Sequence, residues 1–196
     1  MSSVIESLLR NRPSGPLGHS VLYFYFKHSD SAKRTYDSCL RAILEQLMDK
    51  DPAVFDHVFG QLSSEDGVNL RSTKSLETYV KAAVECYRLS YIVLDGLDEC
   101  AVGDSTKVIE YFVGLTEGGL SEPDISLRVI FCGQRDGILD KLLSRHPWIS
   151  LEGSGHIKDI EKYCQSFGEK IETKFGLSAS MVDDIVNQVT STAQGK

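Results

Sequence analysis

Two short stretches of the sequence are almost continuously apolar, and polar residues follow each of them. They read YIVLD at residues 91–95 and RVIFC at residues 128–132. A strand with one face in solvent alternates apolar and polar residues, whereas a parallel strand with both faces covered by helices stays apolar throughout. The two stretches therefore predict a parallel sheet buried between two layers of helices.

Segments with helical periodicity separate the predicted strands, and this alternation predicts a three-layer α/β domain with right-handed crossovers. A last strand is expected at WISLEG, residues 148–153, with Trp148 anchored in the core. The other strands are expected at residues 21–26 and 90–95 and within residues 126–136. The helices are expected at residues 2–12, 32–50, 51–60, 72–89, 104–119, 136–147 and, with a break near 175–180, from 156 to the end. Asp30 or Ser31 would cap the second helix, and Asp104 or Ser105 the fifth.

Composition excludes several classes of protein. The net charge of -7 and the absence of any Lys/Arg cluster argue against binding to nucleic acid. The N-terminal residues are too polar for a signal peptide, and no apolar run is long enough for a membrane span. The five cysteines are scattered and lack C-x-x-C spacing, which indicates reduced thiols and a cytoplasmic location: Cys39, Cys86, Cys100, Cys132 and Cys164.

Three carboxylates follow the strand at residues 91–95. In an open parallel sheet, ligands bind outside the carboxyl ends of the strands, and Asp95 lies at such an end. An aspartate there could hold a magnesium ion through water, and Asp98 or Glu99 could orient or deprotonate an attacking water. The alternative is structural: Asp-Gly is a turn signal, and Asp98 would cap a following helix.

The full string YIVLDGLDEC, residues 91–100, resembles the Walker B motif of the NACHT family, within the STAND class of P-loop NTPases. The following LRVIFCGQRD resembles the sensor-1 strand of these proteins, with Arg135 at its terminal arginine. Residues 21–47 and 148–167 resemble the second strand with its helix, and a later strand with its helix, in fungal NACHT proteins with nephrocystin-like N-terminal regions.

This resemblance implies roles for individual residues. Asp95 would hold Mg²⁺, Asp98 or Glu99 would act on the water as catalytic residues, and Arg135 would contact the outer phosphate of ATP or GTP. Arg135 could instead pair with Asp136 or Asp98. The resemblance also implies a partial NTPase core over residues 1–153 and the start of a helical extension over residues 154–196.

The phosphate-binding loop of the family, G-x-x-x-x-G-K-[ST], does not occur in the sequence. The helix at residues 2–10 resembles the second half of the helix that follows this loop, so we expect the sheet to lack the family's first strand. Nucleotide binding would then be weak, with little or no hydrolysis. Two alternatives stay open: a non-catalytic interaction or regulatory module acting on full-length relatives or on itself, and a gene-model fragment.

Overall fold

The computed structural model describes residues 2–10, 18–62, 72–134, 137–150 and 154–193. These residues form two compact units, one over residues 1–145 and one over residues 146–196, and each unit is described by itself. The domain boundary expected from the sequence, between residues 153 and 154, adjoins residues 151–153, which lie outside the described part.

The first unit is built on three parallel strands in the order β1-β2-β3. They are β1 (His19–Tyr25), β2 (Leu89–Asp95) and β3 (Ser126–Phe131). The strands pair in register, so that one row of residues runs Leu22, Ile92, Val129 across the sheet. The strands predicted from the apolar runs are thus confirmed, as is an α/β fold with a parallel sheet.

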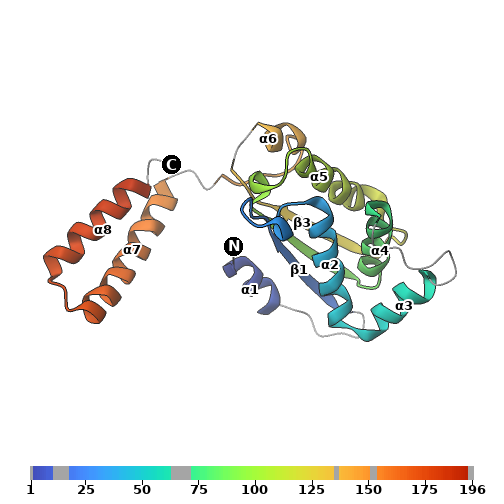
Figure 1. Ribbon diagram of the computed structural model, residues 1–196, viewed down its shortest axis with the longest axis horizontal. Coiled ribbons are helices and arrows are strands. Elements are labelled where there is room, and N and C mark those ends of the chain that lie inside the picture. Colours follow the sequence, from blue (N-terminus) through green and yellow to red (C-terminus); the bar gives the residue numbers. More distant parts are fainter. Residues whose placement is uncertain (1, 11–17, 63–71, 135–136, 151–153, 194–196) are drawn as a thin grey trace. The chain divides into compact units, whose positions relative to one another are not determined.

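Helices connect the strands and account for most of the remaining described residues (Figure 1). They are α1 (Ser2–Arg10), η1 (Ser31–Lys33), α2 (Tyr36–Lys50), α3 (Pro52–Leu62), α4 (Thr73–Glu85), η2 (Leu97–Glu99), α5 (Asp104–Gly114), η3 (Leu115–Gly119) and α6 (Ile138–Leu142).

Two of these helices begin differently from the expectation. Asp30 does cap a helix, but the helix is the short η1; α2 starts later, with the Thr35 side chain accepting from the backbone N–H of Ser38. Asp104 is the first residue of α5 and its carboxylate accepts from the backbone N–H of Tyr36, at 3.0 Å. Asp104 therefore satisfies a free donor at the start of α2 rather than one at the start of its own helix.

The two faces of the sheet are covered very unequally. On one face α2, α4 and α5 enclose the main core, in which Leu22, Ile92, Leu94 and Phe112 are fully buried. On the other face α1 lies against β1, opposite to α2 (Figure 1). Of the residues that the structure describes, a small cluster of Ile5, Val21 and Val93 is buried there.

A pair of serines lies inside the sheet between β1 and β2. Ser20 and Ser90 are register partners, both are 0% exposed, and their hydroxyl oxygens are 2.7 Å apart. Each hydroxyl thus has a hydrogen-bond partner, as buried polar groups require.

The predicted last strand does not form in the residues that are described. Residues 148–150 have no strand structure, and Trp148 is 69% exposed, so its expected place in the core is wrong. An extended segment needs a neighbouring strand to bond to, and none of the described strands lies in register beside these residues. Residues 151–153 are outside the described part.

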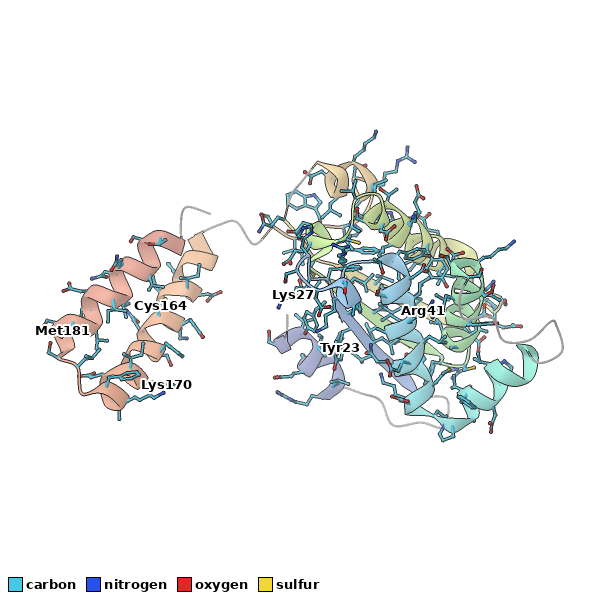
Figure 2. All side chains as sticks on the ribbon, in the orientation of Figure 1. Tyr23, Lys27, Arg41, Cys164, Lys170 and Met181 are labelled. Carbon is cyan, nitrogen blue, oxygen red and sulfur yellow. The ribbon has the colours of Figure 1, made fainter. Side chains whose placement is uncertain are left out.

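The second unit is a helical hairpin of α7 (Ser154–Phe175) and α8 (Ala179–Ala193). The break between them at Gly176, which has a φ of 63°, confirms the interruption expected near residues 175–180. Cys164 and Val182 are buried between the helices, whereas Met181 is 57% exposed (Figure 2). Among the described residues, no helix has the length and apolar character needed to cross a bilayer.

Candidate functional site

The three strands meet the loop Gly96–Glu99 at their carboxyl ends. The backbone N–H of Phe26, just after β1, donates to the carbonyl of Asp95 at 2.8 Å. The N–H of Leu97 donates to the carbonyl of Cys132, just after β3, at 2.9 Å. The loop that carries the three carboxylates is therefore fixed between the two neighbouring strands.

Gly96 makes this path of the chain possible. Its φ is 72°, in the left-handed region that side chains rarely adopt, and a Cβ atom there would lie 3.0 Å from the carbonyl oxygen of Phe26. A larger residue would have to push the end of β1 away. The Asp-Gly pair of the sequence is thus a turn signal, as expected, and it sets the direction in which the acidic residues leave β2.

Asp95 is partly buried at the tip of the central strand. One of its carboxylate oxygens, Oδ1, accepts from the N–H of Gly96 at 3.1 Å. Its negative charge also reaches Cys132: burial, and after it the charge of Asp95, raises the pKa of the Cys132 thiol to about 11. Asp95 is therefore held by its own loop and lies close to the end of β3.

Asp98 and Glu99 are exposed and turn toward different strands. Asp98 Oδ1 accepts from the backbone N–H of Gln134 after β3, at 3.1 Å. A Cβ atom on the adjacent Gly133 would lie 2.9 Å from this same oxygen. Glu99 Oε2 accepts from the N–H of His28 after β1, also at 3.1 Å. The structure therefore places the three acids on one loop but does not direct them at a common point.

The carboxylates of this loop suit a magnesium site in which one or two of them hold the ion and waters supply its other ligands. Among the described residues no group of three or more His, Cys, Asp and Glu side chains could enclose a metal ion. Mg²⁺, however, is often held through one or two carboxylates while keeping several waters. Asp95 has the partial exposure and the location for that mode. Arg135, the expected phosphate contact, lies outside the described residues.

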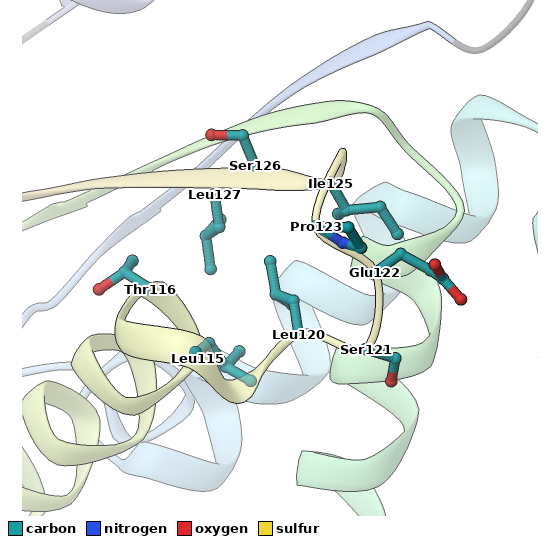
Figure 3. A pocket seen from close by; sticks show the side chains of 10 residues that line it. Leu115, Thr116, Leu120, Ser121, Glu122, Pro123, Ile125, Ser126 and Leu127 are labelled. Atoms are coloured by element: carbon teal, nitrogen blue, oxygen red, sulfur yellow. The ribbon is translucent and has the colours of Figure 1, made fainter.

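A cavity of about 350 Å³ lies away from the acids, at the amino end of β3 (Figure 3). Leu115, Leu120 and Leu127 form its apolar wall, and Ser121 and Glu122 lie at its rim. Because the strands are parallel, this amino end is opposite to the carboxyl end at which Asp95 lies. The cavity and the carboxylate loop are separate features of the sheet.

Sequence reasoning missed two properties of the loop. It assigned chemistry to Asp98 and Glu99 without seeing that their oxygens hold the backbone after β3 and β1. It also gave Cys132 no role beyond that of a reduced thiol and overlooked its proximity to Asp95. The proximity of Cys132 to Asp95 could have been predicted from the sequence, because parallel pairing of the two apolar runs brings Cys132 beside the end of β2.

Comparison with known families gives a match over most of the chain. The family described as Nephrocystin 3, N-terminal matches residues 1–134, which include all three strands and the carboxylate loop. No curated protein matches the chain.

Proposed function

The chain belongs to the Nephrocystin 3, N-terminal family, and on that premise we propose that it is a NACHT-type nucleotide-binding signalling domain of reduced activity. Its ligand would be Mg-ATP or Mg-GTP, and its location would be cytoplasmic. Asp95 is the metal-binding residue in this proposal, Asp98 or Glu99 acts on the water, and Arg135 contacts the outer phosphate.

One observation carries the proposal: Asp95 ends the central strand of a parallel sheet, between two strands whose carboxyl ends meet the same loop. Ligands of open α/β sheets bind at this end. The fixed loop also keeps the Asp95 carboxylate in one place, and Mg²⁺ bound there would neutralise phosphate charge. Asp95 is the residue that we expect to hold the ion, with waters as its other ligands.

Affinity and hydrolysis should both be low. Backbone amides and a lysine of a phosphate loop normally supply most of the contacts to the phosphates, and no such loop occurs in these 196 residues. Asp98 and Glu99 also each use one carboxylate oxygen on the backbone. Water activation would have to compete with these hydrogen bonds.

The test is calorimetric titration of the chain with ATP and with GTP, each with and without Mg²⁺. We expect weak binding that requires Mg²⁺ and is lost in Asp95→Ala. The matched control is Asp124→Ala: Asp124 is an exposed acid that pairs with Arg88 near the amino end of β3, at 3.6 Å, so its loss should leave affinity unchanged. Absence of Mg-dependent binding, or equal loss in both variants, would reject the proposal.

The hydrogen bonds of Asp98 and Glu99 favour a second candidate function, a non-catalytic module that acts on full-length relatives. Acids that hold the ends of β1 and β3 together are structural, and a domain without nucleotide turnover can keep them for that purpose. In this case the wild-type chain binds a purified full-length family member as tightly without nucleotide as with it, and Asp95→Ala binds equally well.

A further inference from the structure

The loop between β1 and α2 carries a cluster of positive side chains at the carboxyl end of the sheet (Figure 2). Lys27, Lys33 and Arg34 are all exposed, and Asp30 is the one acid among residues 27–34 of the sequence. The whole chain has a net charge of -7, so this segment is positive within an acidic protein. The sequence has no run of basic residues here, and it is the fold that brings Lys27 beside the other two.

Backbone hydrogen bonds hold this segment, the basic loop (residues 27–34), in a compact conformation. The N–H of Lys27 donates to the carbonyl of Lys33 at 2.8 Å, and the N–H of Asp30 donates to the carbonyl of Lys27 at 3.1 Å. The Asp30 carboxylate accepts from the N–H of Ala32 at 3.0 Å. The two lysines therefore leave neighbouring backbone positions, and a ligand that binds both does not have to order the loop first.

The basic loop is bonded to the loop that carries the carboxylates. The N–H of His28 donates to Glu99 Oε2 at 3.1 Å, and the carbonyl of Arg34 accepts from the N–H of Ala101 at 2.7 Å. Segments of opposite charge thus lie next to each other at the end of the sheet. They do not neutralise each other, because no ion pair joins the two loops in the part of the chain that the structure describes.

Lys27 lies on the same face of the sheet as Asp95. Phe26 is buried in the main core, so by the alternation of an extended chain Tyr25 and Lys27 are directed to the opposite face, against which α1 packs. Asp95 is directed to that face as well, because Leu94 before it is buried in the main core. Tyr25 is the register partner of Asp95. With strands about 4.8 Å apart and a rise of about 3.3 Å per residue, the Cα atoms of Lys27 and Asp95 are about 8 Å apart, within reach of an extended lysine side chain.

A carboxylate and lysines at this spacing suit one class of ligand, a polyphosphate bound to a divalent cation. The carboxylate holds the cation, and the ammonium groups bind phosphate oxygens that the cation leaves free. An acidic peptide or an anionic membrane surface would be repelled by Asp95, Asp98 and Glu99. A ligand that carries charges of both signs uses both loops.

We propose that the basic loop binds the phosphate oxygens of the ligand held at Asp95, with Lys27 and Lys33 as the binding residues. This role rests on the proposed function, in which Asp95 holds the Mg²⁺ of a nucleotide. The loop reaches the phosphates from the β1 side of Asp95. Because its contacts are purely ionic, its contribution can be measured without a metal ion and without a nucleoside.

The first test is an NMR titration of the ¹⁵N-labelled chain with inorganic tripolyphosphate in the absence of divalent cations. We expect the largest amide shifts in residues 27–34 and weaker binding at higher ionic strength. Lys27→Ala combined with Lys33→Ala should weaken binding at least about tenfold, whereas arginine at both positions keeps the charges and should bind like the wild type. The matched control is Lys81→Ala: this lysine pairs with Glu85 on α4, towards the amino end of β2, and its loss should change nothing. Shifts that spare residues 27–34, or an equal loss in Lys81→Ala, would overturn the proposal.

Calorimetric titration with Mg-ATP separates the basic loop from the proposed function. If both are right, the double lysine variant and Asp95→Ala each weaken binding at least about tenfold. Binding that needs Asp95 but neither lysine would refute the role of the loop and leave the proposed function intact. Binding that needs the lysines but not Asp95 would reject the proposed function and support the loop as a polyphosphate site. If the wild type binds no Mg-ATP, the proposed function is rejected and the tripolyphosphate titration alone decides on the loop.

Discussion

The two faces of the sheet use the same three strands but bury very different amounts of apolar surface. Against α2, α4 and α5, the side chains of one face join a core that continues through these helices and into α3. Against α1, the buried residues within the described part of the chain are Ile5, Val21 and Val93, while Tyr23, Tyr25 and Ile130 stay 37–42% exposed. Stability should therefore depend mainly on the face that α2, α4 and α5 cover, while residues on the α1 face can be changed at lower cost.

The largest effect is expected in the core. Phe112, on α5, is 0% exposed, so Phe112→Ala should lower the free energy of unfolding by about 3–5 kcal/mol, because it removes apolar contact and leaves a cavity. Urea denaturation followed by circular dichroism measures the change. A loss below about 1 kcal/mol would mean that this face is not the main source of stability.

The matched change on the other face should cost less. Val93 is 1% exposed beneath α1, and Val93→Ala removes two methyl groups, so we expect a loss of about 1–2 kcal/mol in the same urea experiment. If Val93→Ala proved as costly as Phe112→Ala, the inequality of the two faces would be wrong.

A smaller loss of stability is expected when a tyrosine hydroxyl is removed, and it should differ between Tyr36 and Tyr25. Tyr36 is buried at the edge of the core and its hydroxyl donates to Glu77 at 2.8 Å, whereas Tyr25 is 38% exposed on the α1 face. Tyr36→Phe should lower stability by about 1 kcal/mol through the lost hydrogen bond. Tyr25→Phe is the control and should change nothing measurable. Equal effects would show that the Glu77 hydrogen bond contributes no net stability.

The smallest expected change concerns a thiol beside the candidate site. The pKa of Cys132 is raised to about 11, first by burial and then by the charge of Asp95. Asp95→Asn removes the negative charge that opposes thiolate formation, so the pKa of Cys132 should fall. The pH dependence of alkylation, read residue by residue by mass spectrometry, measures it.

Cys100 is the internal reference for that experiment. Burial and then the charge of Asp104 raise its pKa to about 11. Asp95→Asn should therefore leave its titration in place, and Cys39, 0% exposed in the core, should stay unreactive at every pH at which the chain is folded. A Cys132 titration that does not move would place Asp95 too far from β3 for a shared site.

Apolar runs and helical spacing were enough to predict the sheet, because the burial of both faces of β2 leaves a direct signature in its residues. They failed at residues 148–150, since an apolar segment carries no information on whether a strand lies beside it. Hydrogen bonds from side chains to backbone groups far away in the sequence could not be predicted either. Nothing near Asp98 in the sequence indicates that its partner is the N–H of Gln134. The sequence therefore predicted that the acids lie at the carboxyl end of a buried strand, but not which backbone groups their oxygens contact.

The buried Ser20–Ser90 pair has a consequence for how the chain folds. Sliding β1 along β2 by two residues would keep every side chain on its proper face, so apolar burial alone hardly distinguishes the two alignments. In the shifted sheet the two hydroxyls would no longer face each other, and either Ser20 would lie opposite Ile92 or Ser90 opposite Leu22. A buried hydroxyl left without its partner costs roughly 1–3 kcal/mol. The hydrogen bond between the two serine hydroxyls thus favours a single register of β1 against β2.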